Sequence, residues 1–271
     1  MRAKDLLSSL RVAVTVNRRG WIGRAAWPAR WSEIGSISLL TQNWLHCRID
    51  PIMENDADIY AVVMGDLVRS EAAPAPEALH AAFNAAVEAA NARAADAIVS
   101  PLTITLGDEF QGLLGSLAEA ARLARHLRFT LMAKGIDCRF VIGQARIETP
   151  VNREKAWNMM GPGLARARET LDEKKQGLTY RFTLLEEAMT ERLLEAIGAG
   201  LAVIERDWTD RQREDIEALL DGQTVEEIAG RRGVTVHSVY KVRSAGDYDA
   251  YTMQWAAVEA ALDAIDGEGT A

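Results

Sequence analysis

Cysteine is scarce in this 271-residue chain. The two cysteines, Cys47 and Cys138, lie far apart, and the sequence has no CxxC motif and no set of Cys and His at metal-ligand spacing. This scarcity excludes a disulfide framework and a structural zinc site, because both need several suitably spaced cysteines or histidines. A reducing compartment is the ordinary setting for such a chain, and we therefore expect a cytoplasmic protein.

Long apolar runs are also missing. No uninterrupted hydrophobic stretch approaches the ~18 residues that a membrane-spanning helix needs, and no signal-peptide core follows the first basic residues. We therefore expect no membrane partner. The hydrophobic fraction of 48% is nevertheless ample for packed cores, and the chain is long enough for two modest domains.

The net charge of −8 is distributed unevenly. Residues 1–52 contain eight Lys and Arg against three acids, a net charge of +5, so the remainder of the chain carries −13. The same leader holds four of the seven Trp residues without helical or alternating periodicity. We predict that Met53 is the native initiator and that residues 1–52 are translated upstream sequence or a disordered leader. A genuine basic arm is the alternative.

Residues 53–183 alternate strand-like and helix-like segments, which predicts an α+β domain with helices packed on a sheet. The expected strands are residues 59–64, 103–106, 109–114, 138–142 and 180–183. The expected helices run from Pro74–Pro76 to about Ala95, from a capping box at Ser116–Glu119 to Lys134, and over residues 163–175. This order is typical of an elaborated ferredoxin-like sheet.

The pattern changes after an expected connector helix at residues 184–204. Two capping boxes, Thr209–Gln212 and Thr224–Glu227, begin helices fifteen residues apart, and a third helix follows Thr235. Residues 205–271 are therefore predicted to form a helix-turn-helix domain with a C-terminal helix. Its expected interior positions are Ile228, Ala229, Val234 and Val239. In the last helix, residues 247–265, the apolar stripe Trp255, Val258 and Leu262 is left to pack or to dimerise.

Two predicted strands end in the same dipeptide. Gly65-Asp66 follows the first strand, and Gly107-Asp108, with Glu109 next to it, forms the predicted turn of a hairpin. Carboxylates at neighbouring strand ends can hold Mg²⁺ or Mn²⁺, which in turn binds phosphate oxygens. Asp66, Asp108 and Glu109 are therefore the candidate metal ligands. A single Gly-Asp pair is more often only a turn, so the hypothesis depends on the two pairs and Glu109 acting together.

These motifs resemble known families. Met64-Gly-Asp-Leu67, Thr105-Leu-Gly-Asp-Glu-Phe110 and Arg139-Phe-Val-Ile-Gly143 resemble the core strands of class III nucleotidyl cyclases and GGDEF diguanylate cyclases. The narrower set of Gly65-Asp-Leu-Val-Arg-Ser70, Leu102 to Gln111, Gly161-Pro162 and Ala167-Arg168, followed by a helix-turn-helix, resembles the bacterial SatD family over about residues 57–255.

The resemblance implies a cyclase-like palm domain that binds a nucleotide. It assigns metal binding to Asp66 and Asp108, matches Glu109 to the acidic residue of GGDEF, and places Arg168 against the phosphates. Two departures count against catalysis: Leu106 replaces the first Gly of GGDEF, and Leu164 stands where the cyclase Asn is expected.

Three further residues are candidates for nucleotide binding, each with a simpler interpretation. Arg69 and Ser70 follow the first Gly-Asp pair and can assist phosphate binding, although a solvated loop is the favoured interpretation. Arg139 lies at the start of the fourth predicted strand. An ordinary salt bridge is the alternative for Arg139.

The helix-turn-helix segment resembles sigma-factor region 4 and carries a local positive charge. Residues 231–243 contain four Lys and Arg and no acid, so this segment can neutralise phosphates even in an acidic chain. The predicted contacts to double-stranded DNA are Arg231, Arg232, His237, Ser238, Lys241 and Arg243. Protein contacts alone are the alternative, because the first helix of this segment is markedly acidic.

The leading hypothesis is a SatD-like regulator in which a palm domain binds a nucleotide with Mg²⁺ or Mn²⁺ and is coupled to a DNA-binding helix-turn-helix. A homodimer is expected, since such proteins usually read paired half-sites, with the 247–265 helix as the candidate contact. One rival is an active metal-dependent nucleotidyl cyclase or transferase that its C-terminal module localises. A second rival is a protein-interaction scaffold.

Overall fold

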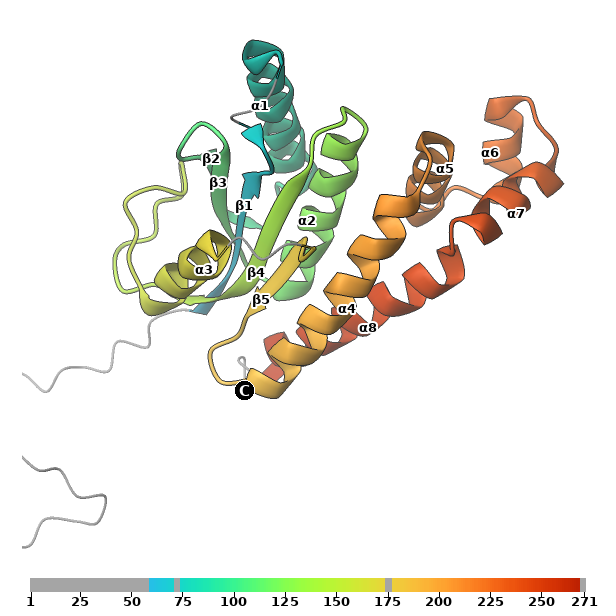
Figure 1. Cartoon of the computed structure of the whole chain (residues 1–271). Coiled ribbons are helices and arrows are strands. Elements are labelled where there is room, and N and C mark those ends of the chain that lie inside the picture. The colour runs from blue at the N-terminus through green and yellow to red at the C-terminus, as the bar shows by residue number, and fades with distance from the viewer. Residues whose placement is uncertain (1–58, 71–73, 174–176, 269–271) are drawn as a thin grey trace, which may run out of the picture. The chain divides into compact units, whose positions relative to one another are not determined.

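The computed structural model describes residues 59–70, 74–173 and 177–268 of the chain (Figure 1). These residues belong to one compact unit, Glu54–Ala271, and the predicted leader and Met53 lie outside them. The strands are β1 (Ile59–Leu67), β2 (Ile98–Ile104), β3 (Glu109–Leu114), β4 (Cys138–Arg146) and β5 (Tyr180–Thr183). The helices are α1 (Pro76–Arg93), α2 (Leu117–Met132), α3 (Pro162–Asp172), α4 (Ala188–Asp207), α5 (Asp210–Leu220), α6 (Val225–Arg232), α7 (Val236–Ala245) and α8 (Tyr248–Glu268).

The five strands form one sheet in the order β2-β3-β1-β4-β5. Neighbouring strands are antiparallel from β2 to β4, and β5 joins the edge parallel to β4. The chain order β1-α1-β2-β3-α2-β4 with β1 in the centre is the ferredoxin-like arrangement. The predicted α+β fold and its order of elements are therefore confirmed.

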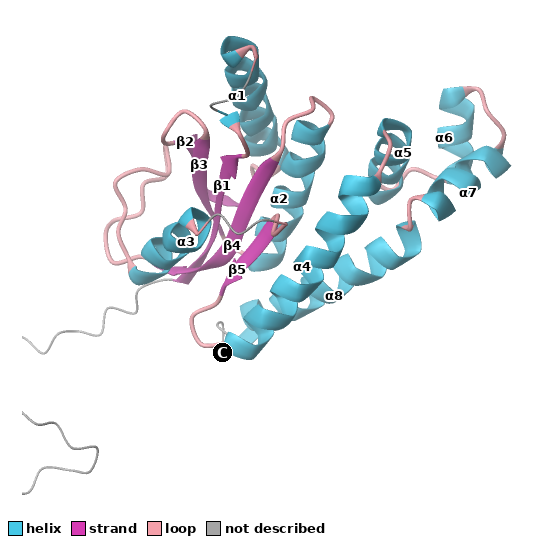
Figure 2. Ribbon diagram, viewed as in Figure 1, coloured by secondary structure: helices cyan, strands magenta, loops and turns pink. Residues whose placement is uncertain are grey.

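Alternation along the strands divides the sheet into two buried faces. Ala61 and Val63 of β1 belong to the core that α1 and α2 cover, whereas Val62 and Met64 belong to a smaller core beneath α3. Figure 2 shows α3 on one side of the sheet and α2 on the other. Because both faces are covered, a ligand can reach the sheet only at its ends.

Strand β1 is longer than the sequence pattern predicts. It continues through Gly65 and Asp66 to Leu67, so the expectation that the strand ends in a Gly-Asp turn is wrong. Gly65 is needed for a different reason: a Cβ there would lie 2.5 Å from Cε1 of Phe110 and 2.7 Å from the carbonyl oxygen of Arg139. The second pair does form a turn, in which Gly107 has a φ of 61°.

Helix α8 packs within the chain along α2 and α4. Its stripe Trp255, Val258 and Leu262 is at most 1% exposed and joins the main core. The stripe therefore packs within the chain, which is the first of the two roles predicted for it, and the 247–265 helix as a dimer contact stays a prediction. The homodimer itself stays a prediction.

Helices α5, α6 and α7 form a small module with its own core. Thr209 and Thr224 both make the predicted capping boxes, and Gly233 ends α6 with a φ of 64°. The module's core contains Ala218, Val225, Ile228, Ala229 and Val239. Val234, predicted as interior, is instead 37% exposed, because it lies in the turn that leads to α7.

None of the helices in the described part of the chain is long and apolar enough to cross a lipid bilayer.

Candidate functional site

Several of the predicted site residues meet at one end of the sheet. Asp66 on the central strand lies directly opposite Glu109 on β3 and Arg139 on β4. Residues that are directly opposite project from the same face of a sheet, so the three side chains share the face that α3 covers. The register thus produces a row of acid, acid and base across three strands.

Asp66 and Arg139 form a two-point ion pair. The Nε of Arg139 donates to Oδ1 of Asp66 at 3.0 Å, and its Nη2 donates to Oδ2. The side chains are only 9% and 18% exposed, so water screens the pair little. Arg139 therefore forms a salt bridge, which was the alternative to its predicted role in nucleotide binding.

Arg168 connects α3 to the β3 end of the same row. Its Nη1 lies 3.1 Å from Oε2 of Glu109, and its Nη2 donates to Oε1 of Gln111 at 2.9 Å. The Arg168 side chain is 39% exposed, and one guanidinium spans both partners. This contact holds α3 on the sheet.

Asp108 is held in the hairpin turn by the loop that follows β1. The hydroxyl of Ser70 donates to Oδ2 of Asp108 at 2.5 Å, and the backbone nitrogen of Leu67 donates to the carbonyl oxygen of Asp108 at 2.9 Å. Arg69, between Leu67 and Ser70, has a φ of 61°, unusual for a residue with a side chain. Ser70 thus supports the hairpin and fixes the course of the loop.

The three predicted metal ligands do not converge. Asp66 faces Arg139, Glu109 faces Arg168, and Asp108 faces Ser70. Among the residues that the structure describes, no group of three or more His, Cys, Asp or Glu is placed to hold a metal ion. Mg²⁺ is usually held by one or two carboxylates together with substrate phosphates, and here Arg139 and Arg168 would compete with the ion for Asp66 and Glu109. Binding of Mg²⁺ or Mn²⁺ stays a prediction.

A large pocket opens beside this end of the sheet, between the end of β1, the start of α1 and the turn after α2. Its volume is about 940 Å³. The wall is largely apolar, with Leu67, Ala78, Leu79, Ala82 and Ile136 among its residues, and Arg69, Ser70, Lys134 and Asp137 are its polar lining. Apolar walls with a few polar groups are typical of small-molecule sites.

The polar lining combines two predicted residues with one that the sequence reading missed. Arg69 and Ser70 were predicted, whereas Lys134 was read only as a helix-ending residue before Gly135. Lys134 is exposed and reaches the site because Gly135, with a φ of 70°, turns the chain back toward β4. The signal for Lys134 in the sequence was its position between a predicted helix and the next predicted strand, where a loop residue can face a ligand.

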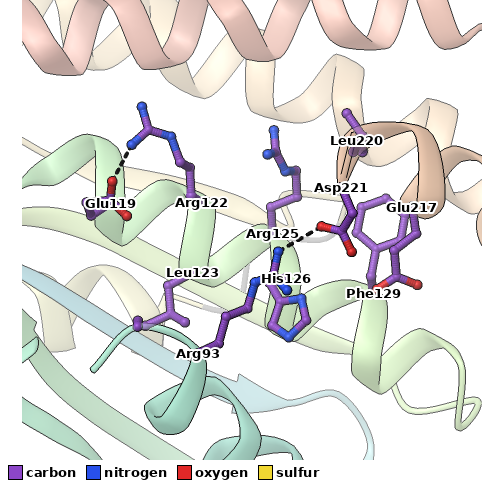
Figure 3. Close-up of a pocket in the computed structure, with 11 residues that line it drawn as sticks. Arg93, Glu119, Arg122, Leu123, Arg125, His126, Phe129, Glu217, Leu220 and Asp221 are labelled. Atoms are coloured by element: carbon purple, nitrogen blue, oxygen red, sulfur yellow. Dashed lines mark hydrogen bonds and ion pairs between the residues drawn. The ribbon is translucent and has the colours of Figure 1, made fainter. Parts of the chain in front are cut away.

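A second, smaller pocket lies between α1, α2 and α5, with a volume of about 290 Å³ (Figure 3). Its charges are largely matched: Arg93 pairs with Asp221 at 2.7 Å, and Arg122 pairs with Glu119 at 2.5 Å. Burial lowers the pKa of His126, and the positive charge of Arg93 acts in the same direction. This pocket is a charged junction that holds α5 against α1 and α2.

The six predicted DNA-binding residues divide into three kinds. Arg231, His237 and Lys241 are exposed on the last turn of α6 and on α7. Ser238 is half-buried, and its hydroxyl lies 2.9 Å from that of Thr235, the residue that caps α7. The remaining two, Arg232 and Arg243, form ion pairs within the chain.

Arg232 and Arg243 are the two that the structure pairs internally. Arg232 forms an ion pair with Asp215, a carboxylate that is 1% exposed. Arg243 forms an ion pair with Asp249 and stacks over the ring of Tyr248 at 4.8 Å. Asp215 lies on α5, a different helix from Arg232, and Asp249 lies on α8, beyond the turn that ends α7, so both partners depend on how the helices pack.

The fold and the pocket define an α+β protein with a ferredoxin-like sheet, a ligand-sized pocket at the sheet's end and a C-terminal three-helix module. The chain belongs to the SatD family, whose family model matches residues 60–241. No match was found among the curated proteins.

A solved structure titled "Structure of a bacterial light-regulated adenylyl cyclase" is similar, with 10% sequence identity and a TM-score of 0.32. The similarity covers 46% of this chain and 42% of that protein, so the chain spans less than half the length of that cyclase. At this level the similarity carries no argument about activity.

Proposed function

We propose that this SatD-family protein is a regulator that binds a nucleotide in the pocket between β1, α1 and the turn after α2, and binds double-stranded DNA through α7. The observation that carries the proposal is the composition of that pocket. An apolar wall and two cationic side chains, Arg69 and Lys134, meet in a volume of about 940 Å³.

The two parts of a nucleotide suit the two parts of this pocket. A base can pack against Ala78, Leu79 and Ala82 on α1, because aromatic bases gain from contact with apolar surface. The phosphates would then lie against Arg69 and Lys134, whose charges and hydrogen-bond donors match phosphate oxygens. Ser70 is held by Asp108 and keeps the loop in place.

Binding without turnover fits the ion pairs at the sheet's end. Asp66 and Glu109 are engaged by Arg139 and Arg168, so neither carboxylate is placed to recruit a metal ion for displacement at phosphorus. The rival function, an active cyclase or transferase, predicts product from a nucleoside triphosphate with Mn²⁺. Product above that of Asp66→Asn would favour this rival.

Nucleotide binding is tested by adding a carboxylate to the pocket. Ala78 is exposed and lines the pocket, whereas Ala85 is exposed on the same helix outside it. Ala78→Glu should weaken nucleotide binding about tenfold or more, since like charges repel, and Ala85→Glu should not. Calorimetric titrations with each nucleoside triphosphate, with Mg²⁺ and with EDTA, measure this. Equal affinities for the two variants would contradict the proposed site.

DNA binding is supported by the surface of α7. Val239 is the buried residue of α7. His237 and Lys241 on the same helix are exposed, and so is Arg231 in the last turn of α6. A helix that contacts the rest of a protein by one side can enter a major groove with the other. Arg232 and Arg243 are paired with carboxylates, so Arg231 and Lys241 supply the positive charge for this contact.

The DNA contact is tested by its dependence on salt. The double variant Arg231→Ala/Lys241→Ala should bind duplex DNA more weakly and lower the slope of log K against log salt by about two. Arg192→Ala/Lys155→Ala is the matched control, since both residues are exposed and lie elsewhere. An unchanged slope in the first variant would favour the scaffold function instead.

A further inference from the structure

A third pocket adjoins the proposed nucleotide site, and four arginines are among the residues that line it. Its volume is about 600 Å³, and it shares Val68, Arg69 and the turn Gly135–Asp137 with the larger pocket. Besides the four arginine residues, one acidic residue, Asp137, is among those that line it. The arginines are Arg69, Arg128, Arg139 and Arg206.

The four arginines come from four separate elements. Arg69 follows β1, Arg128 lies on α2, Arg139 lies on β4 and Arg206 lies in the last turn of α4. All four residues border one pocket, and a guanidinium group can donate two hydrogen bonds to one anion.

Two of these arginines form close ion pairs, and a third is largely exposed. Arg128 is paired with Glu205 and Asp137, and Arg139 is paired with Asp66. Arg206 has a 65% exposed side chain, and its ion pair with Asp207 is long at 3.7 Å. Arg206 is therefore more exposed and less tightly paired than Arg128 and Arg139, and its guanidinium is the best placed of the three to bind an anion.

We infer that this arginine-lined pocket binds a phosphate group as an effector and transmits its occupancy to α7 through the buried pair Arg128–Glu205. The ligand is inorganic phosphate or a small phosphate ester. This site shares Arg69 with the proposed nucleotide site. Arg128, Arg139 and Arg206 belong to this pocket alone, whereas Lys134 and the α1 wall belong to the nucleotide pocket alone.

The first step of the coupling is the environment of Glu205. Its side chain is fully buried, and it accepts hydrogen bonds from the hydroxyls of Tyr180 at 2.8 Å and Tyr251 at 2.7 Å. Arg128 donates to its other oxygen at 3.3 Å. Arg128 is therefore the cation that both Glu205 and a bound anion contact.

The second step leads from Glu205 to the DNA-binding helix. Tyr251 lies on α8, and its ring contacts that of Trp208 with 4.8 Å between centroids. The indole nitrogen of Trp208 donates to the carbonyl oxygen of Gly246 at 2.8 Å, and Gly246 is the C-terminal cap of α7. A continuous series of contacts thus joins the pocket to α7.

An anion in the pocket alters the first of these contacts. Its negative charge competes with Glu205 and Asp137 for the guanidinium of Arg128, so the hold of Arg128 on Glu205 weakens. Burial already raises the pKa of Glu205, and Arg128 opposes that rise. Weaker contact with Arg128 therefore disfavours the charged carboxylate, and the hydrogen bonds around Tyr251 readjust.

The experiment measures phosphate binding and its effect on α7 in the full chain. Phosphate and pyrophosphate are titrated by calorimetry at constant ionic strength, with chloride as the reference anion. Arg206→Ala should weaken binding about tenfold or more, while Arg192→Ala, an exposed arginine on the same helix outside the pocket, should leave it unchanged. Equal binding by wild type, Arg206→Ala and Arg192→Ala would overturn the site.

Hydrogen exchange tests the coupling. Phosphate should change the exchange rates of α7 and α8 amides in the wild type, and Glu205→Gln should bind phosphate yet lose that change. If wild-type exchange in α7 does not respond to bound phosphate, the coupling is overturned. Ala78→Glu should still bind phosphate, which separates failure of this site from failure of the nucleotide site. Stronger binding of phosphate esters than of free phosphate identifies the ester as the effector.

Discussion

Arg139 lies directly opposite Asp66 in the sheet and contacts both oxygens of its carboxylate. The sequence predicted Asp66 as a metal ligand and Arg139 as a nucleotide contact, and in the structure the two side chains bind each other. The pair is largely shielded from water, so its two charges depend on each other.

Removing one partner of this pair should be more damaging than removing both. Arg139→Met leaves the Asp66 carboxylate without its cation and should lower the free energy of unfolding by roughly 3 kcal/mol. Asp66→Asn in the same chain should recover part of that loss. Urea unfolding of the two single variants and the double variant measures the coupling, and additive losses would contradict a direct interaction.

Gly65 should not tolerate a side chain. Gly65→Ala places a methyl group against the ring of Phe110 and the carbonyl oxygen of Arg139, because β1 and its neighbours approach closely there. We expect a loss of about 1–3 kcal/mol, the usual cost of overpacking a core. Thermal unfolding checks this against Gly230→Ala, where an added Cβ has open space around it. A loss no larger than that of the control would contradict the close approach.

Asp266 should anchor α8 to the start of α2. It accepts hydrogen bonds from the backbone nitrogen of Leu117 and the hydroxyl of Ser116, both at 2.9 Å. Asp266→Ala removes these caps and should cost about 1–2 kcal/mol of stability. Asp263→Ala, an exposed aspartate on the same helix, is the control for lost charge. Equal unfolding midpoints for the two variants would argue against the cap.

His126 should make stability depend on pH. Burial and the nearby Arg93 and Arg125 lower its pKa, with Asp221 acting against them, so the unfolded chain binds the proton more tightly. Its contribution to stability is therefore present above about pH 6.5 and is lost as the pH falls through the lower folded-state pKa. Unfolding measured across pH should show a weaker decline below pH 6.5 in His126→Gln than in the wild type.

An exposed histidine, His80, provides the control for His126. His80→Gln on α1 should keep the wild-type decline, since His80 lies at the surface. Parallel curves for wild type and His126→Gln would show that the buried imidazole does not control this range.

Local signals in the sequence determined the elements and their order. Thr209 and Thr224 begin helices because their hydroxyls satisfy free backbone donors three residues on, a purely local interaction. The positive φ at Gly107 and the apolar stripe that contains Trp255 follow from local backbone freedom and helical period in the same way, whereas the burial of that stripe comes from packing against α2 and α4. The SatD motifs also belong to the sequence alone, and the family match confirms them.

Only the tertiary structure decided which charges meet. Asp66 faces Arg139 and Glu109 because the register of three strands places them opposite one another, and Arg168 reaches Glu109 because α3 covers that face. The arginine-lined pocket likewise gathers side chains from four elements. Partners this far apart along the chain are selected by packing and charge in the folded state, which no local pattern encodes.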